Sequence, residues 1–189
     1  MTQKTKIITI IIILTIVGSG FFWLSSHKPS LVDSINNGCF TSEETKTVKG
    51  NSLSGFLENG TEVKVINNFY KCTDNEVKRD DVILFSYSGN KDPLIKIVKA
   101  VPGDKFALFH VGNGWNISIN DEMLTNSKGD LYLINRERYE MLALYEKDYH
   151  GVIPPNSYLI LGNLTEGSTD STQFGLVDKG SLIAKAIVE

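Results

Sequence analysis

The feature that most constrains this chain is an uncharged apolar stretch at residues 7–24. Its length is about what a helix needs to cross the hydrocarbon core of a bilayer, and Lys4 and Lys6 precede it. We therefore predict one transmembrane helix over residues 7–24, with residues 1–6 as a short cytoplasmic N-terminus. The competing interpretation is a cleaved secretory signal, but the apolar cores of such signals usually run for only about 7 to 15 residues.

The rest of the chain has the composition of one domain that folds in water. Of the 189 residues, 22% are charged, the formal net charge is -3, and charges of both signs are interspersed. Because no basic patch stands out, the sequence does not indicate a nucleic-acid-binding surface. Residues 25–44 are polar and contain Pro29, which is typical of a tether, and residues 45–189 are then expected to form an extracytoplasmic domain.

Short segments with the two-residue alternation of strands recur after residue 45, separated by turns rich in Gly, Asn, Asp and Pro. The segments that we assign to strands are residues 62–65, 82–85, 94–101, 115–119, 131–134 and 158–161. Residues 137–146 fit one or two helical turns, but Tyr139, Leu142 and Tyr145 suit a strand nearly as well. We predict a mainly β domain without a long helix outside the membrane.

The two cysteines, Cys39 and Cys72, allow one disulfide, which an extracytoplasmic location would preserve. Two unrelated buried thiols are the alternative. The three histidines are scattered at His27, His110 and His150, so the sequence predicts no metal site. It also has no glycine-rich phosphate loop, and we expect no cofactor.

Serine and lysine are the residue types that remain for hydrolytic chemistry. A serine hydroxyl becomes a nucleophile when a positioned base removes its proton, and lysine can be that base if burial lowers the pKa of its amine. Lys96 meets this condition, because Leu94, Val98 and Ala100 share its face of a strand over residues 94–101. On periodicity alone, the commoner outcome is a lysine that extends its amine to water.

Four segments in order along the chain resemble the three motif boxes of one peptidase family. Residues 48–57 read VKGNSLSGFL, residues 95–104 read IKIVKAVPGD, and residues 155–163 and 168–177 read PNSYLILGN and STDSTQFGLV. The first resembles the nucleophile box of bacterial signal peptidase I, the second its general-base lysine box, and the last two its C-terminal box. The resemblance covers roughly residues 48–186 and implies a signal-peptidase-like antiparallel β domain behind one N-terminal transmembrane helix.

The resemblance also implies a function, that of a membrane-anchored serine endopeptidase which removes signal peptides from exported preproteins through an acyl-enzyme. Ser52 is then the nucleophile and Lys96 the general base, with the Ser52 N–H in the oxyanion hole. Ser168 is expected to hydrogen-bond the Lys96 amine, beside Asp170. Gly50 stands where some relatives carry an oxyanion-binding serine. We expect a monomer whose partners are preproteins and the lipid bilayer.

The chain departs from the family pattern around Ser52 and Lys96. The altered positions are Gly55, Ile97, Asn163 and Thr172. Because Ile97 and Thr172 stand where arginine is common, Asp170 is predicted to lack its usual cationic partners, and Lys99 is a candidate substitute. The loop behind Ser52 has also lost its customary proline.

Three alternative functions stay open on the sequence. A conjugation-type pilin-processing peptidase has the same fold and differs in its substrate. A self-cleaving repressor of the LexA type also pairs serine with lysine, but the membrane segment and the lack of a DNA-binding helical domain disfavour it. The third is an inactive, anchored β module that binds exported peptides, which a wide separation of Ser52 and Lys96 would favour.

Overall fold

The computed structural model describes residues 39–88 and 92–188. The predicted transmembrane helix, and the predicted tether up to residue 38, lie outside the described residues. Within the described residues, no helix is both long enough and apolar enough to span a membrane. The first strand begins at Ser42, inside the segment that the sequence assigned to the tether.

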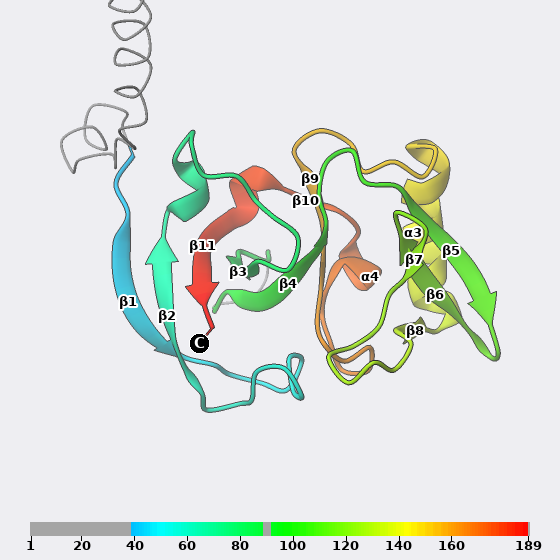
Figure 1. Ribbon diagram of the computed structural model, residues 1–189, viewed down its shortest axis with the longest axis horizontal. Coiled ribbons are helices and arrows are strands. Elements are labelled where there is room, and N and C mark those ends of the chain that lie inside the picture. The colour runs from blue at the N-terminus through cyan, green and yellow to red at the C-terminus, as the bar shows by residue number, and fades with distance from the viewer. Residues whose placement is uncertain (1–38, 89–91, 189) are drawn as a thin grey trace, which may run out of the picture. The chain divides into compact units, whose positions relative to one another are not determined.

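Strands make up most of the regular structure (Figure 1), and every pairing between them is antiparallel. This confirms the prediction of a mainly antiparallel β domain. In chain order the elements are β1 Ser42–Thr47, β2 Glu62–Asn67, η1 Phe69–Lys71, β3 Val82–Phe85, β4 Leu94–Ala100, β5 Phe106–Val111, β6 Gly114–Ile119, β7 Glu122–Met123, β8 Leu133–Ile134, α3 Arg136–Asp148, β9 Ser157–Leu161, α4 Ser171–Phe174, β10 Val177–Asp178, η2 Lys179–Ser181 and β11 Leu182–Ile187.

The larger sheet has the strand order β1-β2-β11-β3-β4-β9-β10. The inner strand β3 is apolar on both faces. On β3, Val82 and Leu84 pack in one hydrophobic cluster, whereas Ile83 and Phe85 pack in another. Because both faces are covered, segments such as β3 appear in the sequence as short continuous apolar runs.

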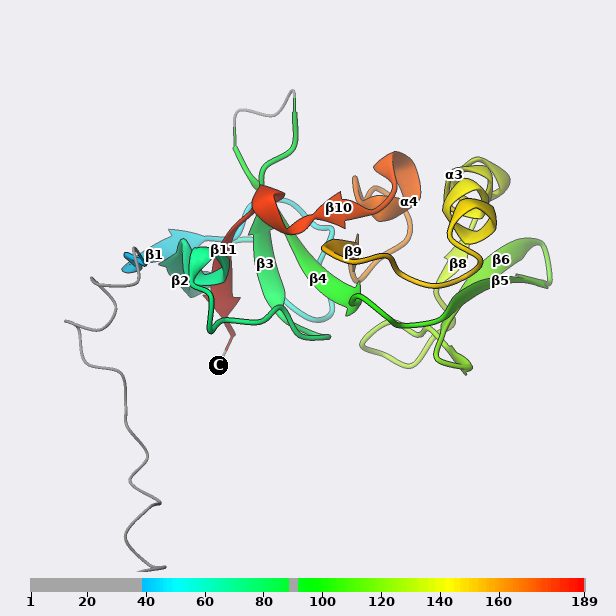
Figure 2. The same cartoon turned by 90° about the horizontal axis from the view of Figure 1, so that it is seen from above.

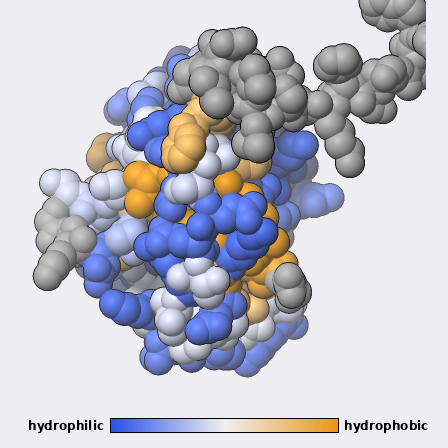
Figure 3. Space-filling view, turned by 90° about the vertical axis from the view of Figure 1, so that its left-hand side faces the viewer, coloured by the Kyte–Doolittle hydropathy of each residue, from blue (hydrophilic) through white to orange (hydrophobic). Residues whose placement is uncertain are grey.

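β1 forms one edge of this sheet and carries charged side chains that face outward. Glu43 pairs with Lys64 at 2.6 Å, and Glu44 pairs with Lys46 at 3.0 Å. Figure 3, which looks onto this end of the domain, shows hydrophilic residues over most of the face, with smaller hydrophobic areas between them. A charged edge strand of this kind resists unwanted pairing with the strand of another chain.

The smaller sheet consists of β5, β6 and β7, with β8 also paired to β6. Helix α3 contacts β5 and β6 and lies along one side of them in Figure 2. Phe106 and Ile117 from this sheet pack in one cluster with Leu159 and Leu161 of β9 and with Ala100 of β4. The two sheets therefore share a core next to β4 and β9, the strands that support the candidate site.

Helix α3 corrects the prediction that no long helix lies outside the membrane, since it contains 13 residues. Asn135 caps it by accepting a hydrogen bond from the Arg138 N–H at 3.0 Å. Leu142 is fully buried, and Tyr139 and Tyr145 pack beside it. Their three-residue spacing is therefore the inner face of a helix. Because the remaining positions are mostly polar, this apolar stripe is narrow and the sequence signal was ambiguous.

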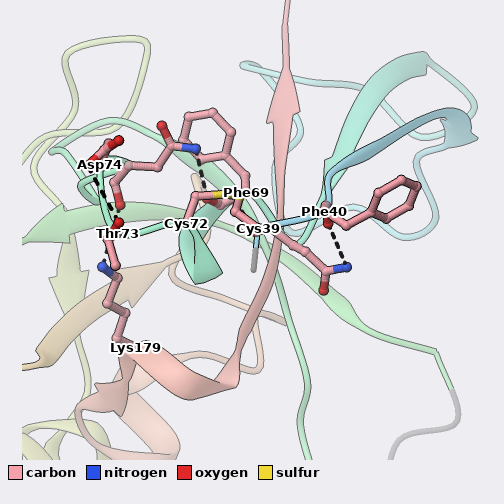
Figure 4. Close-up of a disulfide and its surroundings, with 9 residues drawn as sticks. Cys39, Phe40, Phe69, Cys72, Thr73, Asp74 and Lys179 are labelled. Atoms are coloured by element: carbon pink, nitrogen blue, oxygen red, sulfur yellow. Dashed lines mark hydrogen bonds between the residues drawn. A yellow bond between two sulfur atoms is a disulfide. The ribbon is translucent and has the colours of Figure 1, made fainter. Parts of the chain in front are cut away.

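Cys39 and Cys72 are joined by a disulfide, with their Cα atoms 5.1 Å apart (Figure 4). The bond links the residues before β1 to the end of η1. Nearby, the Asn68 side chain donates a hydrogen bond to the Phe40 carbonyl at 3.3 Å. The first residues of the described domain are thus attached both covalently and by hydrogen bonding to the segment after β2.

Candidate active site

Ser52 lies in a tight loop between β1 and β2 that is anchored by its apolar side chains. Leu53 is 1% exposed, and its carbonyl accepts hydrogen bonds from the N–H groups of Phe56 and Leu57. Gly55, which stands in place of the customary proline turn, donates its N–H to Glu58 Oε1 at 2.7 Å. Local hydrogen bonds therefore hold the loop without proline, while Ser52 itself remains half-buried beside them.

Gly50 lies two residues before Ser52 and adopts a φ of 87°, a left-handed conformation that favours glycine. Its N–H donates to Asn59 Oδ1 at 3.1 Å, which closes the base of the loop. Gly50 thus shapes the turn that leads into Ser52, although it has no side chain to act on a substrate.

Lys96 on β4 brings its amine to this loop. Its Nζ lies 2.9 Å from Ser52 Oγ and 2.8 Å from the Ile95 carbonyl oxygen. The side chain is flanked on its strand by Leu94 and Val98, which pack in the cluster that contains Ile83, as the two-residue alternation predicted. Lys96 is 2% exposed, so its amine is held inside the protein and does not extend to water.

Burial lowers the pKa of the Lys96 amine from 10.5 to about 8, and the Asp170 carboxylate opposes this shift. Desolvation disfavours the charged ammonium, while a nearby negative charge favours it. An appreciable fraction of Lys96 is therefore neutral near pH 8. A neutral amine 2.9 Å from a hydroxyl oxygen can accept its proton.

The chain that follows β9 supports the Ser52 loop from the other side. The N–H groups of Asn163 and Leu164 donate to the Ser52 carbonyl oxygen at 2.7 and 3.2 Å. The Asn163 side chain donates to the Ser54 carbonyl at 2.8 Å and accepts from the Ser127 N–H at 2.9 Å. Asn163, one of the altered positions in the sequence, therefore connects the Ser52 loop to the loop before β8.

Asp170 is fully buried at the N-terminus of α4 and accepts several hydrogen bonds. Its Oδ1 accepts from the N–H and the hydroxyl of Thr172, at 3.0 and 2.6 Å. Its Oδ2 accepts from the Gly162 N–H at 3.0 Å and from the Tyr132 hydroxyl at 3.2 Å. Burial first, and then the charge of Asp170, raise the pKa of Tyr132 well above its usual value. Tyr132 therefore stays a neutral hydrogen-bond donor.

Arg138 on α3 is the cationic partner of Asp170, at 3.5 Å between Nη1 and Oδ1. This corrects the prediction that Asp170 lacks a cation. Lys99, the substitute that the sequence suggested, instead pairs with Asp80 at 2.7 Å. The sequence missed Arg138 because its helix was ambiguous and because 32 residues separate it from Asp170. The signal that indicates this helix is its Asn135 cap.

Ser168 is also fully buried near the site, but the predicted hydrogen bond to Lys96 is absent. Among the described residues, its hydroxyl has no hydrogen-bond partner. The hydroxyl lies against the Cα atom of Gly162, where a β-carbon would contact it and would come within 2.7 Å of the Ser52 carbonyl oxygen. Close packing at Gly162 thus brings Ser168 and the Ser52 loop together.

A cavity of about 280 Å³ opens beside the segment that leads to Ser52. Val48, Val63, Leu84 and Ile95 contribute apolar walls. The residues that line it are Lys46, Thr47, Val48, Lys49, Val63, Val65, Leu84, Asp92, Pro93 and Ile95. Since the Ile95 carbonyl also contacts the Lys96 amine at 2.8 Å, the cavity adjoins Lys96.

The chain is similar to several known proteins. The family model described as "Signal peptidase, peptidase S26" matches residues 2–189. Signal peptidase IB of Staphylococcus aureus is 29% identical over 144 residues, which cover 74% of this chain and 73% of that protein. A protein of the same species named inactive signal peptidase IA is 31% identical over 137 residues, 72% of each chain. A crystal structure of a signal peptidase I from Enterococcus faecalis is 24% identical, with a TM-score of 0.40 over 57% of this chain and 93% of that chain.

Proposed function

Because this chain belongs to the signal peptidase family, peptidase S26, and is a serine peptidase, we propose that it removes N-terminal signal peptides from exported preproteins, with Ser52 as nucleophile and Lys96 as general base. The observation that carries the proposal is the 2.9 Å separation between Ser52 Oγ and the Lys96 amine. The burial of Lys96 supports it further, since burial keeps part of the amine neutral.

In the first half of the reaction, neutral Lys96 accepts the Ser52 hydroxyl proton while Oγ attacks the scissile carbonyl carbon. The resulting Lys96 ammonium donates its extra proton to the departing amine, so the peptide C–N bond breaks and an ester to Ser52 remains. The product released at this stage is the mature protein with a free N-terminus. The signal peptide stays attached as the acyl group.

In the second half, Lys96 accepts a proton from water, and the hydroxide attacks the ester carbonyl. Collapse of this intermediate breaks the bond to Oγ, and the Lys96 ammonium returns a proton to Ser52. The signal peptide then leaves with a free carboxylate. In both halves, the former carbonyl oxygen carries a negative charge in the tetrahedral intermediate, and the Ser52 backbone N–H is proposed to donate a hydrogen bond to it. Loss of one such donor typically costs about a hundred- to thousandfold in rate.

On the substrate side, the cavity next to Lys49 and Ile95 is the proposed binding site for the residues before the cut. Its volume of about 280 Å³ and its apolar walls suit small side chains one and three positions before the scissile bond. A preprotein bound in extended form beside these segments would gain its register from backbone hydrogen bonds.

Confinement to a membrane would help this reaction, because enzyme and substrate on one surface meet at a raised effective concentration. We propose residues 7–24 as the anchor and an extracytoplasmic location for the domain. The inactive relative makes the alternative of a binding module worth testing. The short distance between Ser52 and Lys96 favours the peptidase.

The test is incubation of the detergent-solubilised full chain with a model preprotein, with the products identified by mass spectrometry. The expected result is one cut directly after the signal peptide, abolished by Ser52→Ala and retained by the neighbouring control Ser54→Ala. A preprotein with a bulky residue directly before the cut is expected to resist cleavage. Binding of the preprotein without any cleavage would instead support the inactive binding module.

A further inference from the structure

Arg138 reaches from α3 into the segment that follows β9, and its guanidinium is nearly buried, with 11% of the side chain exposed. One nitrogen, Nη1, contacts Asp170 Oδ1 at 3.5 Å and also the Thr172 hydroxyl. The other, Nη2, donates to the Ser168 carbonyl at 2.8 Å. A single side chain from the smaller sheet's helix thus fixes three residues of the segment that surrounds the dyad.

Asp170 is connected to the Ser52 loop through two successive backbone N–H groups. The Gly162 N–H donates to Asp170 Oδ2 at 3.0 Å, and the next N–H, of Asn163, donates to the Ser52 carbonyl at 2.7 Å. A displacement of Asp170 therefore moves the backbone that supports Ser52. Because the carboxylate is fully buried, it also needs a compensating positive charge in place.

We propose that Arg138 is a positioning residue for the Ser52 and Lys96 dyad, and that it supplies from α3 the positive charge that Ile97 and Thr172 do not. The inference rests on the proposed function, because it assigns Arg138 a role in that reaction. Arginine suits the position, since its planar fork can contact Thr172, Asp170 and the Ser168 carbonyl at once, which the single ammonium of lysine cannot do.

The proposal also concerns the protonation of Lys96, because burial lowers the pKa of the Lys96 amine and the Asp170 charge raises it. Among the described titratable groups, Arg138 from α3 and Tyr132 from the segment before β8 contact Asp170, and the pKa of Lys96 from β4 responds to the Asp170 charge. Without Arg138, the Asp170 charge acts on Lys96 without compensation and raises the pKa of its amine. The N–H groups of Gly162 and Thr172 both donate to this carboxylate.

Arg138→Gln tests the proposal, and Arg136→Gln is its matched control. Arg136 lies on the same helix but is 81% exposed and pairs with Glu140 at the surface. For Arg138→Gln, we expect the acidic limb of the kcat/KM profile to move up by about one pH unit. The pKa shift alone then costs about tenfold at pH 7 and is recovered at higher pH, whereas loss of the forked contacts lowers kcat by about a further ten- to a hundredfold at every pH. For Arg136→Gln, we expect a wild-type profile.

Arg138→Lys distinguishes the effect of the positive charge from the effect of the forked contacts. Since it keeps a positive charge, its acidic limb is expected to stay near that of the wild type, while kcat falls about ten- to a hundredfold because the forked contacts are lost. This variant carries the test if Arg138→Gln does not fold. A wild-type kcat for Arg138→Lys, or an unshifted acidic limb for Arg138→Gln, would overturn the proposal.

A second readout distinguishes failure of this inference from failure of the proposed function. The pH dependence of Lys96 acetylation, followed by mass spectrometry in the full chain, reports the pKa of the amine whether or not the protein cleaves anything. A higher pKa in Arg138→Gln than in Arg136→Gln supports the role of Arg138, even if no preprotein is cut. Equal values in the two variants would refute it, even if the wild type is an active peptidase.

Discussion

The N–H of Asn163 donates a 2.7 Å hydrogen bond to the carbonyl oxygen of Ser52, so the residues after β9 hold the candidate nucleophile through its backbone. The Asn163 side chain adds a 2.8 Å bond to the carbonyl of Ser54 and two bonds to Ser127. A position that deviates from the family pattern in sequence therefore has a defined supporting role in the structure.

Replacing Asn163 with alanine is expected to lower kcat about tenfold or more, with a smaller effect on KM. The backbone bond to Ser52 remains, but the Ser54 carbonyl and the Ser127 N–H lose their partner. Leaving such groups unsatisfied costs about 1–3 kcal/mol of stability. The measurements are steady-state cleavage kinetics and urea unfolding.

Asn163→Asp is the matched variant, since it keeps the oxygen that accepts from the Ser127 N–H at 2.9 Å but loses the donor to Ser54. Its effect is expected to be at least as large as that of Asn163→Ala, because its second carboxylate oxygen would face the Ser54 carbonyl oxygen without a hydrogen between them. If Asn163→Ala has wild-type kinetics and stability, then this side chain does not hold the loop.

The activity is expected to depend on pH through the Lys96 amine. Because the base must be neutral and its pKa is lowered to about 8, kcat/KM should rise about tenfold per pH unit below pH 8 and level off above it. A pH series with a fluorogenic signal-peptide substrate measures this dependence. A rate that is constant or falls between pH 6 and 9 would argue against Lys96 as the base.

Lys96, the proposed general base, is expected to reduce the stability of the fold. Its pKa is about 8 in the folded protein and near 10.5 when unfolded, so the unfolded chain binds more protons between these values. Lys96→Met should therefore be inactive but more stable at pH 7 by about 1–2 kcal/mol, since it removes a buried amine.

The stability difference between Lys96→Met and the wild type is also expected to depend on pH. As the pH rises from about 8 toward 10.5, the wild type gains stability and the advantage of Lys96→Met shrinks. Urea unfolding at pH 7 and pH 10 provides the comparison. An advantage that grows with pH would show that burial of the amine is not what limits stability here.

The sequence and the structure agree best where local patterns decide the outcome. Two-residue alternation placed Lys96 on an apolar face, and its side chain is indeed buried. Periodicity did not single out Ser52 among its neighbouring serines, because a loop has no repeating pattern. The resemblance to signal peptidase motifs selected it. Its distance from Lys96 depends on the pairing of strands far apart in the chain.

Contacts between distant segments account for what the sequence did not predict. Arg138 meets Asp170 because α3 packs on the smaller sheet, whose core includes residues of β4 and β9. Ser168 reaches the site, but its hydroxyl has no partner among the described residues, so the hydrogen bond to Lys96 expected from the family is not formed. Such details follow from packing, which a linear motif does not encode.

Whether Ser52 and Lys96 act together is tested most directly by kcat/KM of the wild type and four variants on one signal-peptide substrate. Ser52→Ala and Lys96→Ala are each expected to lower kcat/KM by at least about a thousandfold, and the double variant no further, because residues that act as a unit are not additive. Lys99→Ala is the control, since Lys99 lies on the same strand but pairs with Asp80. Wild-type kcat/KM in either single variant at Ser52 or Lys96 would contradict the account.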